Sequence, residues 1–296
     1  MKSPSAHAAA APAPDATLLA EVESRLEQFV EEADYAPNLR DAVAYALLGG
    51  GKRLRPLLAL RCAEAVGGRR SEAIEVACAV EMVHAFSLVH DDLPALDNDA
   101  MRRGRPTLHV ARGEAMAILA GDALLALAVH AACCALREPA RMVRELTDAT
   151  TLMISGQVYD TLGGCPESMP PAAKLRTIHE RKTGALIRCA CRMGAIAGGA
   201  QGRALDAIDG WGTAIGLMFQ AVDDLLDETQ SAEHVGKATG KDRELGKLTY
   251  PAVYGIERTR EEVETLRADA QRAILPLGEA AKPLSDLTEY MASRTR

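Results

Sequence analysis

The sequence predicts an all-α protein, built as a single large helical bundle. Apolar residues make up 48% of the 296 residues and aromatic residues only 3%, so the core must consist mainly of Ala, Leu, Val, Ile and Met. Ala, Leu and Met are good helix formers, and the long β-branched runs that are typical of strands are missing. These two observations favour helices packed on helices.

Helical periodicity is nearly continuous from about residue 18 to residue 293. The predicted breaks are short and rich in Gly or Pro: residues 49–51, 67–68, 94, 104–106, 163–171, 198–199 and 236–246. None of them is long enough to be an interdomain linker, so we expect one bundle of roughly ten helices. The first 16 residues are Ala/Pro/Ser-rich and predict a disordered tail ahead of one domain over residues 17–296.

Two segments are exceptionally apolar. Residues 71–90 are apolar almost all round, which predicts a helix at the centre of the bundle. Residues 115–136 are the most apolar window, but they contain Gly121, Asp122 and His130. We therefore interpret this window as a buried core helix and expect no membrane span.

Charge and cysteine content narrow the class of protein. The net charge is −7, and no broad basic face of the kind that binds nucleic acid is present. The seven cysteines include no CxxC pair, and most of them lie in apolar helical sequence. We expect reduced core thiols in a cytoplasmic protein.

The sequence Asp223-Asp224-Leu225-Leu226-Asp227 ends a strongly apolar stretch. On a helix Gln220, Asp223 and Asp227 share one face, with Asp224 beside them. A solvated acidic helix end is the alternative, but the preceding apolar residues place these acids at the wall of a cavity. Clustered carboxylates repel one another, so the pattern favours bound Mg²⁺, which prefers oxygen ligands.

The first acidic cluster along the chain contains Asp91, Asp92 and Asp97, so that Asp223 to Asp227 form the second. His84, Ser87 and Asp91 share a helical face, whereas Asp97 would leave it in an unbroken helix. Pro94 supplies a break that can bring Asp97 back toward Asp91. An acidic loop is the alternative, but the arginines that follow suit a metal-bound diphosphate whose other oxygens are held by guanidinium groups. The candidate arginines are Arg102 and Arg103.

Further cations lie in glycine-containing segments. Gly50-Gly51 precedes Lys52, Arg53 and Arg55, where close backbone approach and positive charge suit an anion, although a basic turn is an equally good interpretation. The Walker spacing is absent. Three more lysines are candidates for binding a second anion; the alternative is that each is a solvated surface charge. They are Lys182, Lys237 and Lys247. The Gly/Lys segment after the second acidic cluster has the composition of a lid that excludes water.

Taken in order, these motifs resemble the trans-polyprenyl diphosphate synthase family, of the bacterial farnesyl diphosphate synthase type. The resemblance runs from about residue 18 to the C-terminus. It rests on GGGKRLRP at 49–56, LVHDDLPALDNDAMRRGRPTLH at 88–109, LAGDALL at 119–125, Gly156-Gln157, KTGALI at 182–187 and GLMFQAVDDLLDE at 216–228. It implies an isoprenoid synthase bundle with a central substrate cavity. It also implies a homodimer.

The resemblance implies a reaction between isopentenyl diphosphate and an allylic diphosphate. Three Mg²⁺ ions, for which Mn²⁺ can substitute, are expected to bind Asp91, Asp92, Asp97, Asp223 and Asp227. By similarity, a second set stabilises the departing diphosphate or the allylic cation: Arg102, Lys182, Thr183, Gln220 and Lys237, with Lys247 as a further substrate-binding residue. Isopentenyl diphosphate is expected to contact Lys52, Arg53, Arg55, His84 and Arg103.

Product length is expected to depend on Phe86 and Ser87, which occupy the family's chain-length positions before the first Asp. The large Phe86 ring predicts that growth stops mainly at C15, as in a (2E,6E)-farnesyl diphosphate synthase; packing between helices is the alternative role for this ring. C20 or C10 synthases remain alternative functions. A class I terpene cyclase would not need the basic motif at 52–55, and a non-catalytic subunit would typically lose acidic-cluster residues that this chain keeps.

Overall fold

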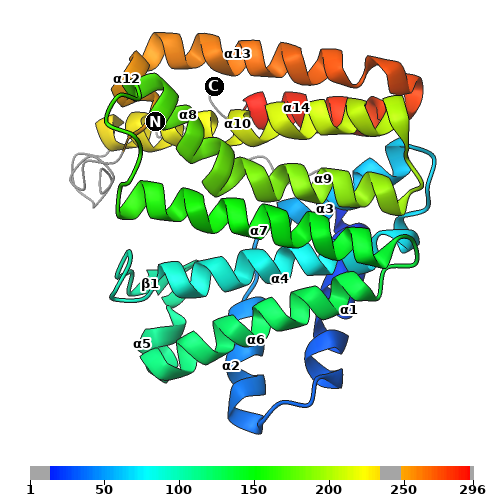
Figure 1. Cartoon of the computed structure of the whole chain (residues 1–296), viewed down its shortest axis with the longest axis vertical. Helices are drawn as coiled ribbons and strands as arrows, with labels where there is room; N and C mark the ends of the chain where they lie inside the picture. The colour runs from blue at the N-terminus through cyan, green and yellow to red at the C-terminus, as the bar shows by residue number, and fades with distance from the viewer. Residues whose placement is uncertain (1–13, 234–247, 294–296) are drawn as a thin grey trace, which may run out of the picture.

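The computed structural model describes residues 14–233 and 248–293 as an all-α bundle, which confirms the predicted fold class (Figure 1). The longer helices are α1 (Pro14–Glu32), α2 (Pro37–Leu47), α3 (Leu54–Ala65), α4 (Ile74–Asp91), α6 (Glu114–Cys133), α7 (Pro139–Thr161), α8 (Pro171–His179), α9 (Ala185–Ala197), α10 (Gly202–Glu233), α13 (Ile256–Ala273) and α14 (Lys282–Ser293). The shorter elements are 3₁₀ turns at Arg70–Glu72 and Leu275–Ala281, α5 (Leu108–Arg112), a π-helix at Glu180–Gly184 and α12 (Tyr250–Tyr254).

The sequence did not indicate the small hairpin that follows α4. Strands β1 (Met101–Arg102) and β2 (Arg105–Pro106) pair antiparallel, with Arg102 opposite Arg105. Arg103 and Gly104 form the turn, both with positive φ. The hairpin therefore presents three arginines close together beside the end of α4.

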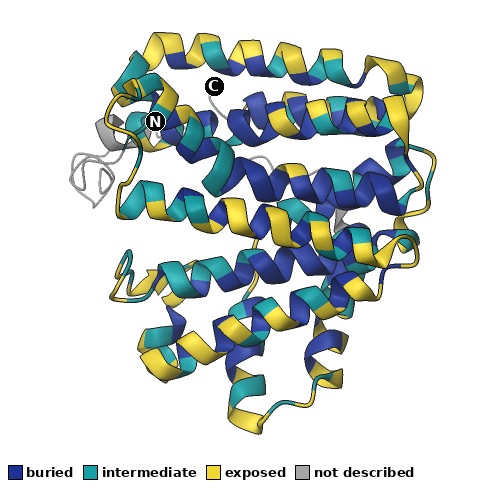
Figure 2. Ribbon diagram, in the orientation of Figure 1, coloured by how far each residue is buried: buried dark blue, intermediate teal, exposed yellow. Residues whose placement is uncertain are grey.

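Helix α4 lies in the middle of the bundle, as its all-round apolar pattern predicts. It contacts α1, α2, α3, α6, α7 and α9, and buried positions occur around its whole circumference (Figure 2). Close backbone approach elsewhere in the core needs glycine. A Cβ on Gly194 of α9 would lie 2.0 Å from the carbonyl oxygen of Ala59 in α3, so a larger residue would push the two helices apart.

Helix α6 is long and apolar enough to cross a membrane by length and composition alone. It also contacts α2, α4, α5 and α7, and residues such as Leu124 and Ala128 are completely buried against them. A core helix of a helical bundle passes the same test, so this single match is weak support for a span.

The first and last helices close the bundle. Helix α1 begins at Pro14, inside the predicted tail, and residues 1–13 lie outside the described residues. At the other end, Trp211 of α10 donates a hydrogen bond from Nε1 to Thr288 Oγ1 of α14 at 3.0 Å. Both side chains are buried, so this bond fastens the C-terminal helix to the core.

Three helices that carry the sequence motifs end at the same side of the molecule. The C-terminal ends of α4, α7 and α10 all lie at the left of Figure 1, and the β1–β2 hairpin is next to the end of α4. The helices between them run back in the opposite direction through short connections, so the chain returns to the same end of the bundle. Residues far apart in sequence are thereby gathered there.

Candidate active site

The first acidic cluster lies where α4 stops. The helix ends at Asp91, and Pro94 prevents its continuation. The chain then turns back, so that the backbone N–H of Asp97 donates to the carbonyl oxygen of Asp91 at 2.9 Å. The predicted return of Asp97 toward Asp91 is thus present in the backbone.

Asp91 is held in an unfavourable environment for a carboxylate. Burial is the main cause that raises its pKa to about 6, and repulsion by Asp97 and Asp92 adds to the shift. Lys182 and Arg102 act in the opposite direction and offset only part of it. A bound cation would relieve the same repulsion, so this end of α4 has the electrostatics of a metal site.

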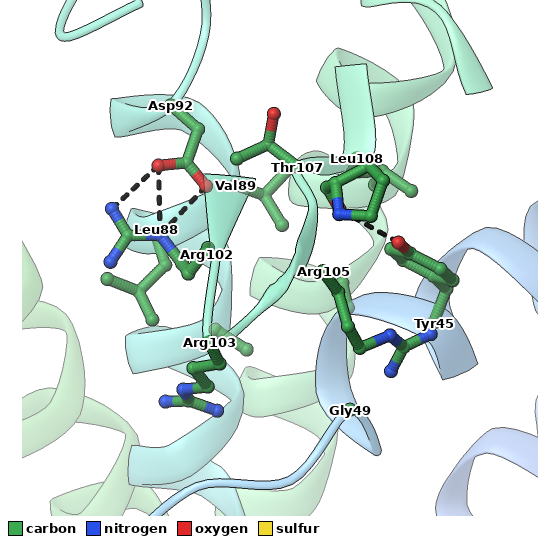
Figure 3. A pocket seen from close by; sticks show the side chains of 13 residues that line it. Tyr45, Gly49, Leu88, Val89, Asp92, Arg102, Arg103, Arg105, Thr107 and Leu108 are labelled. Atoms are coloured by element: carbon green, nitrogen blue, oxygen red, sulfur yellow. Dashed lines mark hydrogen bonds and ion pairs between the residues drawn. The ribbon is translucent and has the colours of Figure 1, made fainter. Parts of the chain in front are cut away.

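Asp92 and Arg102 form an ion pair. Two guanidinium nitrogens of Arg102 donate to the Asp92 carboxylate, with distances of 2.6 to 2.9 Å (Figure 3). The Asp92 side chain is almost entirely buried. The structure therefore brings together two predicted site residues, but it directs them at one another rather than into a shared ligand position.

Arg103 and Arg105 lie near this pair, around a small cavity. The cavity has a volume of about 60 Å³ and is also lined by Tyr45, Asp92 and Arg102 (Figure 3). The Arg105 guanidinium stacks over the Tyr45 ring at 4.1 Å, and Arg103 donates to the carbonyl oxygen of Gly50. The hairpin is thereby attached to the glycine-rich loop between α2 and α3.

Arg53 has a different role from the predicted one. Its guanidinium donates to Glu23 Oε1 at 2.6 Å, to Glu81 Oε1 at 2.8 Å and to the carbonyl oxygen of Leu47 at 2.7 Å. The side chain is only 2% exposed. Each guanidinium nitrogen is bound to a protein group, so Arg53 ties the basic loop to α1 and α4 rather than presenting a free cation to a substrate.

Arg55, two positions further on, is in the opposite situation. Its Nε is buried and has no hydrogen-bond partner, and burial together with the charge of Arg103 lowers its pKa. His84 faces the same cations: burial first, then Arg55 and Arg103, hold its pKa well below the usual range. Lys52 is exposed next to them. A neutral histidine among three cations, one of them with a buried and unpartnered N–H group, forms a site that suits a multiply charged anion.

The residues Lys182 and Thr183 lie on the π-helix between α8 and α9. Single turns of π-helix are rare and frequently occur at functional sites, because the extra residue redirects neighbouring side chains. Here Lys182 Nζ donates to Asp160 Oδ2 of α7 at 2.5 Å. Thr183 Oγ1 donates to Gln220 Oε1 of α10 at 2.8 Å.

This chain of hydrogen bonds continues through Asp224. Gln220 Nε2 donates to Asp224 Oδ1 at 2.8 Å, and the backbone N–H of Tyr250 donates to Asp224 Oδ2 at 2.9 Å. Asp224 therefore orients Gln220 and binds the first turn of α12. Asp160 and Asp224 were not predicted as site residues. Asp160 could have been found from its position three residues after Gln157, one helical turn along the same face.

The second acidic cluster lies on the last turns of α10. The charge of Asp223 opposes the lowering of the Arg55 pKa by burial, so these two opposite charges interact across the end of the bundle. Asp227, one turn further along, is exposed at the helix surface. The predicted lysines Lys237 and Lys247 lie outside the described residues.

The donor set fits Mg²⁺. Carboxylate oxygens from α4, its following loop and α10 are the hard ligands that this ion prefers. Within residues 14–233 and 248–293, no three acidic, histidine or cysteine side chains converge as a preformed metal site. The ligands would therefore have to be completed by other oxygens, and phosphate groups supply these where Mg²⁺ binds through few carboxylates.

The chain-length candidates lie further down α4. Ser87 Oγ donates to the carbonyl oxygen of His84 at 2.9 Å. Phe86 is buried, with its ring edge-on to the His90 ring at 4.9 Å. His90 Nε2 in turn lies 3.1 Å from the carbonyl oxygen of Ile118 in α6, a contact that fits a donated hydrogen bond. The Phe86 ring thus packs toward α6.

The close packing of α4 against α6 at this point depends on a glycine. A Cβ on Gly121 would lie 2.1 Å from His90 Nε2, so only glycine leaves room for the imidazole ring. The Phe86 ring consequently packs on a His90 ring that is itself fixed against the α6 backbone.

Comparisons with known proteins identify the family. The model of the family described as "Polyprenyl synthetase" matches residues 36–274. The chain is 44% identical over 264 residues to geranylgeranyl pyrophosphate synthase 4 of Arabidopsis thaliana, covering 87% of this chain and 71% of that protein.

Two solved structures illustrate the shared fold. A geranyltransferase from Legionella pneumophila has a TM-score of 0.82 at 32% identity, over 95% of this chain and 96% of its own. A geranylgeranyl pyrophosphate synthetase from Pyrococcus horikoshii has a TM-score of 0.79 at 27% identity, over 94% and 97%. With the family model matching most of the chain, the protein belongs to the polyprenyl synthetase family of trans-prenyltransferases and has the all-helical isoprenoid synthase fold.

Proposed function

We propose that this polyprenyl diphosphate synthase condenses isopentenyl diphosphate with dimethylallyl diphosphate and its longer allylic homologues. The observation that carries the proposal is the pairing of two charged regions at one end of the bundle. Carboxylates from α4 and α10 lie close to cations from the basic loop and the hairpin, as the interaction of Asp223 with Arg55 illustrates. Two diphosphates, one with bound metal and one held by arginines, match this division.

The allylic half of the site lies around the π-helix. Lys182 places a positive charge between Asp160 and Asp91, where the diphosphate leaving group would be stabilised. The Thr183 and Gln220 oxygens supply preorganised negative dipoles for an allylic cation. Mg²⁺ held by Asp91, Asp97, Asp223 and Asp227 would supply Lewis acidity toward the departing diphosphate.

The isopentenyl half of the site is formed by Arg55, His84 and Arg103, with Lys52 at its edge. The Arg55 Nε has no hydrogen-bond partner in the protein, so it is available to a diphosphate that stays bound while the other one leaves. The isopentenyl double bond then attacks the allylic carbon, and the released diphosphate accepts the proton. Arg102, bound to Asp92 in this structure, lies between the two halves.

For the product we propose C20 geranylgeranyl diphosphate. Two observations support it over C15: the similarity to a geranylgeranyl pyrophosphate synthase at 44% identity, and the packing of the Phe86 ring toward α6. The second candidate is C15 farnesyl diphosphate, which the size of Phe86 favours. Ser87, on the face of Asp91, leaves space for a longer tail.

Product analysis tests both statements. The enzyme is incubated with isopentenyl diphosphate, Mg²⁺ and dimethylallyl, geranyl or farnesyl diphosphate, and the dephosphorylated products are separated by chromatography. We expect geranylgeraniol from all three primers and no product after chelation of Mg²⁺. Farnesol as the end product would establish the C15 candidate. Cyclic hydrocarbons without consumption of isopentenyl diphosphate would contradict the proposed reaction.

A further inference from the structure

One turn of α7 is bound directly to the π-helix. A Cβ on Gly156 would lie 2.3 Å from the backbone nitrogen of Lys182, so the two backbones touch at this point. One turn later Asp160 accepts the hydrogen bond from Lys182 Nζ. Gln157 follows Gly156 directly and lies three residues before Asp160, so it projects from the same part of the helix surface as the Asp160 carboxylate.

Gln157 lies in this turn, and its amide group has no partner. Both Nε2 and Oε1 are buried without a hydrogen bond, and within the described part of the chain no other side chain has two such atoms. Thr161, one turn further on the same face, also has a buried and unpartnered Oγ1. Buried polar groups are nearly always hydrogen-bonded in native proteins, so an amide without a partner needs an explanation.

The surroundings of Gln157 belong to the allylic half of the site. Lys182 lowers the pKa of Asp91, which places that charge near the end of α4. The residue after Lys182, Thr183, binds Gln220 of α10. The ends of α4, α7 and α10 lie at the same side of the bundle (Figure 1).

We propose that Gln157 is a further substrate-binding residue, whose amide donates from Nε2 to a diphosphate oxygen of the allylic substrate next to Lys182. The inference rests on the proposed function. A diphosphate only accepts hydrogen bonds, so the N–H₂ end of the amide makes the contact. The protein keeps this group unpaired when the substrate is absent, and its folding stability is lower for that reason.

The test uses Gln157→Met, which keeps the length of the side chain and removes its polar atoms. Thermal unfolding is measured without ligands. Binding is measured by calorimetry with dimethylallyl S-thiolodiphosphate plus Mg²⁺, and separately with isopentenyl diphosphate. We expect an unchanged melting temperature, or one raised by about 2–4 °C. The affinity for the allylic probe should fall at least about tenfold, while that for isopentenyl diphosphate stays within twofold.

Thr150→Val is the matched control. Thr150 is buried on the same helix, but its Oγ1 already donates to the carbonyl oxygen of Leu146 at 2.7 Å. Its replacement should leave both affinities unchanged and should not raise the melting temperature. If Gln157→Met does not fold, Gln157→Leu gives the same readouts.

The outcomes separate this assignment from the proposed function. An allylic affinity within twofold of wild type in the variant overturns the assignment, and so does an equal loss of affinity for both ligands. A wild-type enzyme that does not bind the allylic probe overturns the proposed function together with it. Stability maintained or gained, with a selective loss of allylic binding, supports the assignment, because a structural amide would lose stability on replacement.

Discussion

At the residue scale, two arginines of one motif perform opposite tasks. Arg53 is buried with Glu23 and Glu81, whereas Arg55 has an unpartnered Nε that faces other cations. The first stabilises the loop, and the second is kept available for an anion. The motif alone cannot distinguish them, because the carboxylates that neutralise Arg53 come from helices α1 and α4.

Replacing Arg55 should affect one substrate selectively. Arg55→Gln removes a charge-assisted contact to isopentenyl diphosphate, so its KM should rise at least about tenfold. The KM for the allylic substrate should change less than threefold, because Lys182 lies in the other half of the site. Steady-state kinetics with each substrate varied in turn provides the measurement; equal changes in both KM values contradict the assignment.

Arg53→Met is the contrasting variant for that experiment. It leaves Glu81 buried without its partner, which should lower the free energy of unfolding by about 3–5 kcal/mol. Adding Glu81→Gln should restore part of the loss. A stable Arg53→Met protein with a selective rise in the KM for isopentenyl diphosphate would instead reinstate Arg53 as a substrate-binding residue.

His179 should contribute to the pH dependence of stability. Burial lowers its pKa to about 4, and its ring stacks on Tyr250 at 5.3 Å. In the unfolded chain the histidine titrates near pH 6.5, so the unfolded state binds the extra proton first as the pH falls. The contribution is fully present above pH 6.5 and decreases between pH 6.5 and 4, by at most about 3 kcal/mol.

Urea denaturation of wild type and His179→Phe at several pH values measures this contribution. The aromatic ring is kept, but the titrating group is removed. The free energy of unfolding of the variant should decrease less than that of wild type between pH 7 and 4.5. Parallel curves for the two proteins would show that His179 titrates alike in the folded and unfolded states.

At the element scale, α4 connects the fold to the chemistry. Its apolar circumference fixes it in the core, and Pro94 ends it where the acidic cluster is needed. Both features are local properties of the sequence, so both could be predicted. The β1–β2 hairpin and the π-helix could not, because they depend on contacts between Arg103 and Gly50 and between Lys182 and Asp160, which are distant in sequence.

The same limit explains the residues that sequence reasoning missed. Asp224 belongs to an acidic cluster, but helical spacing places it beside the face of Gln220, Asp223 and Asp227 and assigns it no role of its own. Its actual partners, Gln220 and the Tyr250 backbone, become neighbours only when α10 packs against α12. The predicted pairs within one helix, such as Gln220 with Asp223 and Asp227, need no such information and follow from helical spacing.

Phe86 should influence product length through the contact between α4 and α6. Phe86→Ala removes the ring that packs on His90 and opens space between the two helices. We expect longer products than those of wild type, measured by chromatography after dephosphorylation. Phe29→Ala, a buried ring on α1, is the control and should leave the product distribution unchanged. The same distribution in Phe86→Ala as in wild type would assign the cavity floor to other residues.

At the scale of the whole molecule, the homodimer stays a prediction. Exposed apolar side chains gather on consecutive helices α5, α6 and α7: Val110, Ile118, Leu119, Leu152, Ile154 and Val158. Exposed apolar side chains on neighbouring helices favour association with a second copy. Light scattering at micromolar concentration should give a dimer for wild type and a monomer for Leu119→Glu. A fully active wild-type monomer would contradict the prediction.

The central claim is that the carboxylates of the two acidic clusters, on α4 and on α10, act together in one metal-dependent condensation. Single-turnover formation of product from isopentenyl and geranyl diphosphates, at saturating Mg²⁺, tests it most directly in wild type, Asp91→Ala and Asp223→Ala. Each variant loses a carboxylate that would hold Mg²⁺, and with it part of the stabilisation of the charge that develops on the departing diphosphate. Each rate should therefore fall at least ~100-fold while the protein remains folded. Near wild-type rates in both variants would contradict the two-cluster site.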